Sequence, residues 1–401
     1  MNTKNTILII TNRVPFPLKD GGALAMYAMI KGWHDEGKKV FLLAMNTSRH
    51  SVLKSELPPI FNKIAGFEMT DVDTGIHVLP VVSNFIFSTK PQHAERFFNK
   101  KIANKITAAI HKVKPDIIQL ESIYLQEYAP LIRQHSKALL IQRLHNIEGE
   151  VWKRLAAETA NALKKFYLKN LAKRIAAYEE LVWQDCDAII PISNPDANAI
   201  KKSGCETPMI TIPFGIEEAG FSKHPTDKWD AYHIGAMDWQ PNVEAMEWMN
   251  AEIVPEIVKQ NPDFTFQFAG RNMPERFEQN KEKSFFCAGE VADANAFIAD
   301  KKILIVPLRS GSGIRIKTLE GMAAGKIVIS TGVGIQGIEA LDRIHFLKAD
   351  TPEEFANAIH WISENKVLAE KIAQNAHELL QANHNQKKLM RKLSDFVEKL
   401  P

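Results

Sequence analysis

The chain has 401 residues, more than one hydrophobic core ordinarily holds, so two domains are expected. Hydrophobic residues make up 45% and charged residues 24% of the sequence, a globular composition that excludes disordered and fibrous proteins. Fifty basic and 47 acidic residues leave a net charge of +3, which excludes a dedicated nucleic-acid binder and requires any basic function to be local.

The first apolar run, residues 7–11, is too short for the core of a signal peptide, so export is not expected. No stretch approaches the roughly 20 apolar residues of a transmembrane helix. Cys186, Cys205 and Cys287 are widely spaced, which argues against a disulfide framework or a zinc site and fits a reducing compartment. We therefore expect a cytoplasmic protein, with any membrane contact peripheral at the inner face of the membrane.

Short apolar, β-branched runs alternate with helical patterns in the first half of the chain. The runs are at residues 7–11, 40–44, 76–81, 117–120, 139–141, 188–192 and 209–213. Their length and lack of polar interruptions suit strands that are covered on both faces. Between them, Met26, Met29, Ile30 and Trp33 have helical spacing, and residues 148–180 are expected to form one long helix. The alternation predicts a parallel, doubly wound sheet.

The pattern breaks in residues 217–230, which are charged, contain a proline and have no apolar periodicity. A second series of runs follows at residues 232–236, 264–269, 285–288, 303–307, 327–331 and 344–347. The sequence therefore predicts an α/β protein with two Rossmann-like, doubly wound domains, residues 1–216 and 217–385, that face each other across an interdomain cleft. Residues 386–401 form an amphipathic helix that is expected to pack back on the first domain.

The segment after the run at 303–307 is rich in glycine and opens a helix. Gly311 and Gly313 let backbone amides approach a ligand, and the helix start adds N–H groups and a positive dipole end. Arg315 and Lys317 place positive charge at the positive end of the helix dipole, which is unfavourable unless an anion binds there. Glu320, one turn further, can accept hydrogen bonds from a ribose. We interpret the segment as a phosphate site; the simpler alternative is a glycine turn whose solvent-facing Lys317 pairs with Glu320.

Two features of the first domain follow predicted strands, where ligands of open α/β sheets bind. Asp20-Gly21-Gly22 opens the first helix, so its amides can meet a phosphate or an acceptor, although an ordinary strand-to-helix turn fits the same residues. His145 follows the run at 139–141, where a histidine has a better than usual chance of meeting substrate. We interpret His145 as functional and leave both roles open for the glycine pair.

Other nucleotide and metal motifs are disfavoured. Ile316 stands where a dinucleotide fingerprint needs its third glycine, and the chain lacks the phosphate loop of P-loop NTPases. Asp71-Val-Asp73 resembles a metal-binding Asp-x-Asp motif, but it precedes the run at 76–81, so we interpret it as a turn. The sequence therefore predicts no cofactor and no metal site.

Two stretches interleave basic and aromatic residues. They contain Lys90, Arg96, Lys100, Lys101 and Lys105 with Phe87, Phe97 and Phe98, and then Lys164, Lys165, Lys169, Lys173 and Arg174 with Phe166 and Tyr167. Such surfaces can attract anionic lipid, but solvated helix faces have the same composition. The sequence does not decide between these two interpretations.

Taken together, these segments resemble the group 1 glycosyltransferases, family 4, of the GT-B architecture. The resemblance covers nearly the whole chain. Residues 307–325 carry it most specifically, with support from residues 20–22, 143–148, 192–194, 233–242, 268–271 and 289–291. It implies transfer of a hexose from a nucleotide-sugar donor to a hydroxyl of a sugar or lipid-linked acceptor, with retention and without a metal. The family's usual products are cell-surface polysaccharide, lipopolysaccharide or glycolipid.

The resemblance also assigns residues by position. Gly289, Glu290 and Val291 would meet the base and Glu320 the ribose. Ser312, Gly313, Ile314, Arg315 and Lys317 would surround the diphosphate, with Gly21, Gly22 and His145 completing the site from the first domain. His145, Arg315 and Lys317 are the predicted catalytic residues, chiefly through stabilisation of the leaving phosphate.

Two departures from the family pattern matter. The first of the family's paired glutamates, eight positions apart, is replaced by Ser312, while the second is Glu320. The arginine and lysine that many members carry after the strand opening the second domain are missing after Ala236. We hypothesise that Arg315 and Lys317 replace those charges. A sugar-nucleotide epimerase of the same architecture and a sugar-nucleotide-binding protein without catalysis are the competing functions.

Overall fold

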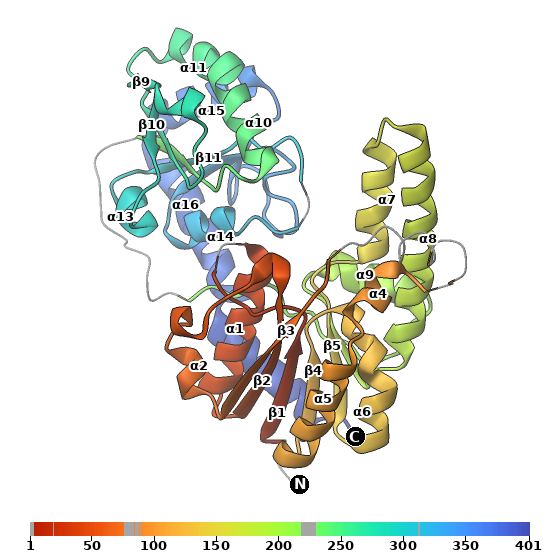
Figure 1. Cartoon of the computed structure of the whole chain (residues 1–401). Helices are drawn as coiled ribbons and strands as arrows, with labels where there is room; N and C mark the ends of the chain where they lie inside the picture. The colour runs from red at the N-terminus through yellow and green to blue at the C-terminus, as the bar shows by residue number, and fades with distance from the viewer. Residues whose placement is uncertain are drawn as a thin grey trace. The chain divides into compact units, whose positions relative to one another are not determined.

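The computed structural model describes residues 4–18, 20–75, 84, 88, 90–217, 230–311 and 313–401. The chain forms two compact units. Unit 1 comprises Met1–Gly215 with Gln386–Pro401, and unit 2 comprises Ile216–Asn385. Both are α/β, with parallel strands covered by helices (Figure 1). The strand expected at residues 76–81, Phe87, Ser312 and most of the segment 217–230 lie outside the described residues.

Unit 1 contains a parallel six-stranded sheet in the order β3-β2-β1-β4-β5-β6. The strands are β1 (Thr6–Thr11), β2 (Lys39–Thr47), β3 (Gly66–Val72), β4 (Ile117–Leu120), β5 (Leu139–Arg143) and β6 (Ala188–Ile190). Ile7 and Ile9 belong to one buried apolar cluster and Leu8 and Ile10 to another. The sheet is therefore buried on both faces, as the short apolar runs predict.

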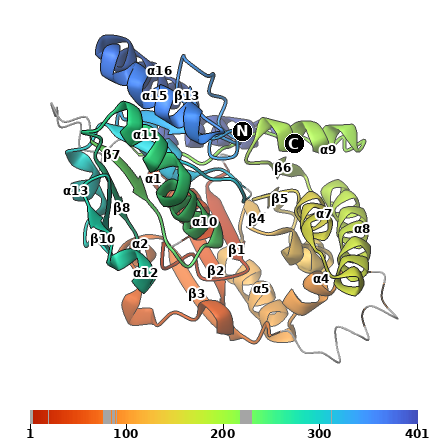
Figure 2. The ribbon, with the colours of Figure 1, turned by 90° about the horizontal axis from the view of Figure 1, so that it is seen from above.

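The helices of unit 1 cover both faces of this sheet (Figures 1 and 2). They are α1 (Gly21–Asp35), α2 (Ile60–Lys63), α4 (Gln92–Phe97), α5 (Lys100–Val113), α6 (Ala129–His135), α7 (Glu148–Glu158), α8 (Ala162–Gln184), α9 (Asn194–Lys202) and α17 (Gln386–Glu398). Short 3-10 turns occupy Ser48–His50, Lys54–Glu56 and Ile123–Tyr128.

The helix α17 belongs to unit 1 although it comes last in the chain. Its buried face, with Leu389, Met390 and Leu393, joins the apolar cluster that contains Ile7 and Ile9. Gln386 Nε2 donates to the Ala28 carbonyl of α1 at 2.8 Å. The apolar stripe of this charged helix is thus covered by the first half of the chain.

Unit 2 contains a seven-stranded sheet in the order β13-β12-β11-β7-β8-β10-β9, in which only the β10–β9 pair is antiparallel. The strands are β7 (Ala231–Ile234), β8 (Phe266–Ala269), β9 (Lys281–Glu282), β10 (Phe285–Gly289), β11 (Ile303–Val306), β12 (Ile327–Ser330) and β13 (Leu347–Lys348). The helices are α10 (Gln240–Trp248), a π-helical stretch at Met249–Ile253, α11 (Val254–Gln260), α12 (Glu275–Glu278), α13 (Ala294–Ala299), α14 (Ile316–Ala323), α15 (Pro352–Glu364) and α16 (Lys366–Asn383).

The expectation of a turn at Asp71-Val-Asp73 was wrong, because Asp71 and Val72 end strand β3. The sequence pattern did not predict strand β3, because the strand lies at the sheet edge and carries polar residues among its apolar ones. The aspartates serve local structure: Asp71 accepts a hydrogen bond from Asn46 Nδ2 at 2.7 Å, and Asp73 accepts one from the Gly75 amide at 2.8 Å.

Three further expectations need correction. Residues 148–180 form two helices, because Asn161 caps a new helix by accepting from the Lys164 amide. Residues 209–213 form no named strand: Met209 bridges Ile189, and the Ile210 and Ile212 amides donate to the carbonyls of Ile189 and Pro191, but Pro191 has no N–H to return a bond. At the run 344–347, residues 343–345 form a turn in which Arg343 is left-handed with φ of 59°, Phe346 makes one bridge to Asp342, and the strand begins only at Leu347.

Candidate active site

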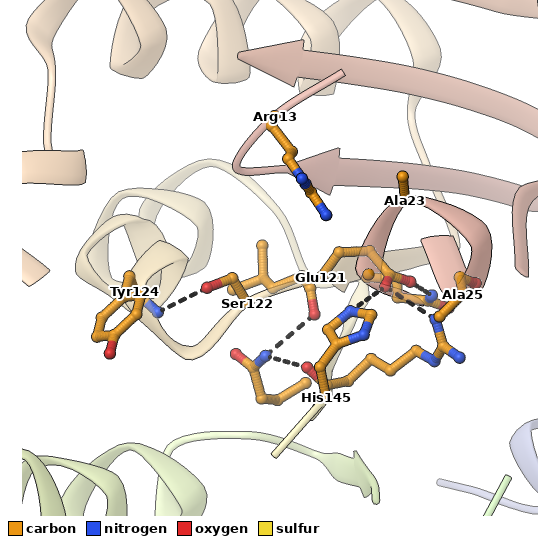
Figure 3. A network of polar contacts seen from close by, with 12 residues as sticks. Arg13, Ala23, Ala25, Glu121, Ser122, Tyr124 and His145 are labelled. Carbon is orange, nitrogen blue, oxygen red and sulfur yellow. Dashed lines mark hydrogen bonds and ion pairs between the residues drawn. The ribbon is translucent and has the colours of Figure 1, made fainter. Parts of the chain in front are cut away.

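His145 of unit 1 is held by a buried carboxylate. It lies two residues beyond the end of β5, and its side chain is 20% exposed. Its Nε2 atom is 3.0 Å from Oε2 of Glu121, the residue that follows β4 and whose side chain is fully buried (Figure 3). Because β4 and β5 are neighbouring parallel strands, their carboxyl ends bring these two side chains together.

Glu121 also binds Arg143, which connects the histidine to the start of α1. Arg143 Nη1 lies 3.0 Å from Glu121 Oε2 and donates to the Ala25 carbonyl at 2.9 Å. Gln119 Nε2 donates to the other carboxylate oxygen of Glu121 at 2.5 Å. The structure thus links two predicted features of unit 1, His145 and the helix that Gly21 and Gly22 open, through a residue that the sequence did not single out.

The charge of Glu121 determines the tautomer of His145. Burial alone would raise the pKa of this carboxyl, but Arg143, His145 and Gln119 together hold it below its usual range. An ionised carboxylate only accepts hydrogen bonds, so Nε2 of His145 carries a proton. The ring atom left for a substrate is therefore Nδ1, which can accept a hydrogen bond when the ring is neutral and donate one when it is charged.

Amides at the start of α1, where the glycine pair lies, already donate to a carboxylate of the protein itself. Asp20 caps the helix by accepting from the amides of Gly22 and Ala23, each at 3.0 Å, and it forms an ion pair with Arg13. Burial alone would raise the pKa of Asp20, and the contacts with Arg13 and these amides lower it below its usual value. A phosphate at this helix start would compete with the Asp20 carboxylate for those N–H groups.

In unit 2 the glycine-rich segment has the backbone conformation that only glycine adopts readily. Gly311 and Gly313 have φ angles of 113° and 80°. The hydrogen bonds within α14 begin with the Thr318 and Leu319 amides, which both donate to the Arg315 carbonyl. Arg315 itself is buried, donates from Nη1 to the Gly313 carbonyl at 2.7 Å and stacks 5.5 Å from the ring centre of Trp239. Its side chain therefore helps to shape the loop.

Lys317 reaches from α14 to the end of β7. Its Nζ donates to Asn242 Oδ1 at 2.7 Å and lies 2.9 Å from His233 Nε2. A Cβ atom at Gly235, the first residue after β7, would lie only 2.5 Å from this Nζ. The ammonium group is therefore placed beside Gly235, and it does not face solvent beside Glu320 as the simpler alternative would have it.

The polar groups around Lys317 are strongly perturbed by burial. Burial, reinforced by Arg315, lowers the pKa of Lys317 to about 7. Burial raises the pKa of Glu320 to about 7, against the effect of Lys317. Burial and Lys317 lower the pKa of His233 well below its usual value, so its ring is neutral. Since Lys317 donates to Nε2, the proton of His233 is on Nδ1, which donates to the Ile305 carbonyl at 2.9 Å.

The predicted base-binding residues end the strand β10. Gly289 is its last residue and has a φ of 72°, and its carbonyl accepts a hydrogen bond from the Gly270 amide at 2.9 Å. Glu290 is exposed and Val291 half-buried. Ile314 is half-buried beside Gly337, where a Cβ atom would meet it at 2.8 Å. These positions lie at carboxyl ends of strands or in the loop after β11, where α/β sheets bind ligands.

Sequence reasoning missed Glu121, His233 and Asn242. Glu121 carried a usable signal, because a charged residue directly after an apolar strand is placed at the ligand-binding edge of the sheet. His233 lies inside an apolar strand and Asn242 inside a helix, so only the fold brings them to Lys317. Among the described residues, no group of three or more His, Cys, Asp or Glu side chains could hold a metal ion. No helix in the described part of the chain is long and apolar enough to cross a membrane.

Comparison with known proteins gives a family match for most of unit 2. Residues 230–365 match the family model described as Glycosyl transferases group 1. A Klebsiella pneumoniae protein described as an uncharacterized 44.6 kDa protein in the cps region is 25% identical over 292 residues, which cover 69% of this chain and 72% of that protein.

Solved structures are similar over the whole chain. Sucrose-phosphate synthase from Thermosynechococcus elongatus superposes with a TM-score of 0.68 at 17% identity and covers 99% of both chains. HepE of Anabaena, solved in complex with UDP, gives 0.66 at 14% identity over 98% of this chain and 100% of its own. TarM of S. aureus gives 0.68 at 12% identity over 98% and 99%. Residues 230–365 thus match the group 1 glycosyltransferase domain, and the chain as a whole has the GT-B fold of these solved structures.

Proposed function

We propose that this protein transfers a hexose from a nucleotide-sugar donor to a hydroxyl of a sugar or lipid-linked acceptor, with retention of configuration and without a metal ion. The bond between the anomeric carbon and the β-phosphate oxygen breaks, and the acceptor oxygen bonds to the anomeric carbon on the same face. The acceptor proton passes to the departing phosphate oxygen. The protein's main contribution in this scheme is stabilisation of the leaving diphosphate.

The observation that carries the proposal is the position of Lys317. Its ammonium group lies beside Gly235, immediately after the strand β7. That is where the resemblance to the family expects cations and where this chain has none in its own sequence. Arg315 reaches the same loop, since its guanidinium group stacks on Trp239. This arrangement supports the hypothesis that α14 supplies the charge that neutralises the diphosphate.

Each remaining group has a role in the proposal. Glycine amides at 311 and 313 and the α14 helix start bind phosphate oxygens. The resemblance also assigns Ser312 and Ile314 to the diphosphate. Glu320 binds the ribose, and the backbone of Gly289, Glu290 and Val291 binds the base. Gly21 and Gly22 meet phosphate or acceptor, and His145 contacts the transferred sugar through Nδ1.

The proposed pathway is synthesis of a cell-surface polysaccharide, lipopolysaccharide or glycolipid. Its support is the K. pneumoniae relative, whose description places it in a cps region. Uridine nucleotides are the first donors to test, because HepE was solved with UDP and with UDP-glucose. We further propose that the protein works in the cytoplasm at the inner face of the membrane, where a lipid-linked acceptor is within reach.

The test is incubation of the purified full chain with a panel of isotopically labelled UDP-, GDP-, ADP- and dTDP-hexoses, with and without EDTA. We expect one donor to release nucleoside diphosphate, faster with acceptor, with unchanged rate in EDTA and an α-configured product by NMR from an α-linked donor. An epimerised sugar would identify an epimerase instead. Binding of a donor without turnover would identify a non-catalytic protein, and inhibition by EDTA would contradict metal independence.

A further inference from the structure

The end of the helical hairpin formed by α7 and α8 exposes large apolar side chains. The two helices lie side by side, and the end that joins them lies away from the sheet of unit 1 (Figures 1 and 2). Leu163 is 84% exposed and Phe166 67% exposed in the first turns of α8, and Leu155 is 43% exposed near the end of α7. Exposed apolar side chains gathered at one place indicate a surface that another phase or molecule covers.

These side chains are not needed to hold the hairpin together. Ala156, Leu168, Leu171 and Ile175 form a buried cluster of their own between the helices, with Trp152 and Tyr167 packed against it. At the base of the hairpin, the Glu179 carboxylate accepts the amides of Glu148 and Gly149 at 2.7 and 2.8 Å. The hairpin is therefore a supported element, and its tip residues can be changed without opening its core.

The same end of the hairpin is basic. Residues 153–169 contain five basic residues and one acidic residue, and residues 162–178 contain five basic residues and no acidic one. Lys164 and Lys169 are exposed on α8 on either side of Phe166. Lys153 is 72% exposed at its side chain and pairs with Glu150 at 3.1 Å. Cations that flank exposed apolar side chains match an anionic bilayer, in which phosphates lie above hydrocarbon.

We propose that this tip, residues 153–169, docks on an anionic lipid bilayer. Leu163 and Phe166 enter the boundary between headgroups and acyl chains, and Lys164 and Lys169 meet lipid phosphates. A soluble polyanion would engage the lysines but would leave the apolar pair in water, so the combination favours the bilayer. The inference rests on the proposed function for its biological sense, since it would hold the enzyme near a membrane-borne acceptor, but its test does not use transfer activity.

The experiment is flotation of the full chain with vesicles of phosphatidylcholine containing about 30% phosphatidylglycerol, at about 0.05 M and about 0.5 M NaCl. We expect binding at the low salt concentration that weakens at the high one, and little binding to vesicles of phosphatidylcholine alone. The double variant Leu163→Ala/Phe166→Ala should weaken binding by about thirtyfold. The double variant Lys164→Gln/Lys169→Gln should weaken it by about twentyfold and reduce the salt dependence.

The matched control is Leu181→Ala. Leu181 is on the same helix and is also 67% exposed, but it lies near the opposite end of α8 from the tip. Its replacement should leave vesicle binding unchanged, and thermal melts should show all variants folded. The proposal is overturned if wild-type protein does not float with anionic vesicles or if both double variants bind as well as wild type. It is also overturned if sedimentation shows that the tip variants convert a dimer to a monomer, because the tip would then bind a second copy.

The two proposals fail separately. Donor turnover with a water-soluble acceptor and no vesicle binding would contradict only the docking surface. Tip-dependent vesicle binding without turnover of any donor would contradict only the transferase proposal.

Discussion

Binding of a nucleoside diphosphate to Lys317 should take up a proton above neutral pH. The pKa of Lys317 is about 7 in the unliganded protein, against an ordinary value of 10.5. Above pH 7 the amine is therefore mostly neutral, and a diphosphate that favours the ammonium form restores its proton. Affinity should fall as pH rises above 7, to about a fifth of its pH 7 value at pH 8 and about a fiftieth at pH 9. The loss between pH 7 and pH 8 corresponds to about 1 kcal/mol.

Two other groups that titrate nearby can be separated from this effect. Phosphate esters lose their second proton near pH 6, so the ligand is already fully charged above about pH 7. Burial raises the pKa of Glu320 to about 7, so its carboxylate ionises over the first part of the same range. Ionisation would improve its hydrogen bonds to ribose, which is the opposite direction. The Glu320→Gln variant removes that contribution and should leave a steeper fall in affinity.

The assay is titration calorimetry of UDP binding at about pH 7, 8 and 9, with two buffers of different ionisation enthalpy at each pH. The buffers should report uptake of about 0.9 proton at pH 8. Lys317→Arg keeps its charge throughout and should not lose affinity above pH 7, whereas Lys317→Met should bind weakly and should also lack the fall seen in wild type. A wild-type dissociation constant that stays constant from pH 7 to pH 9 would refute the assignment of Lys317 to the diphosphate.

Four further substitutions and one control test other parts of the site. Arg315→Ala should lower kcat/KM by about a hundredfold, through loss of charge at the leaving phosphate, and unchanged donor kinetics would contradict its assignment. Glu121→Gln should destabilise the protein by about 3 kcal/mol, because it leaves buried Arg143 without its carboxylate, and it should also lower kcat; His145→Ala should lower kcat with a smaller loss in a urea melt. Equal stability of Glu121→Gln and wild type would argue against that ion pair. Gly235→Ala should displace the Lys317 ammonium and weaken UDP binding about as much as Lys317→Met, whereas Gly332→Ala, whose new Cβ would have contacts no closer than 3.7 Å, should bind UDP normally.

The parts of the fold that the sequence predicted are those in which local pattern and tertiary position agree. The run at 303–307 is apolar throughout because β11 lies in the middle of its sheet with both faces covered, and it was predicted correctly. The strand β3 was missed because an edge strand is only partly buried and carries polar residues. The hairpin of α7 and α8 was predicted as one helix because Asn161 interrupts a chain that remains helix-forming on both sides.

The site residues were likewise predicted where local sequence specifies them and missed where tertiary contacts do. The glycines and cations at 311–317 stand close together in the sequence, so their pattern was visible without a fold. The partners of Lys317 were not visible, because His233 and Asn242 are 84 and 75 residues away from it. Glu121 is 24 residues from His145 and becomes its neighbour only because β4 pairs with β5. Sequence pattern therefore identified which residues carry charge, and strand order determined which groups surround them.

The two units contain cations of different kinds, a buried Arg143 and a half-buried Lys317, and the difference bears on the proposed function. Arg143 of unit 1 lies 3.0 Å from the carboxylate of Glu121, so its charge is compensated within the protein, as a structural ion pair requires. Lys317 of unit 2 contacts an amide oxygen and a neutral imidazole, which satisfy its hydrogen bonds without supplying a negative charge. Its position in the first turn of α14, at the positive end of the helix dipole, adds to the cost of that charge. The nearby carboxyl that attracts this charge is Glu320, whose own pKa burial raises to about 7. A bound anion would stabilise the ammonium group further, which is the role that the proposed diphosphate has at this helix start.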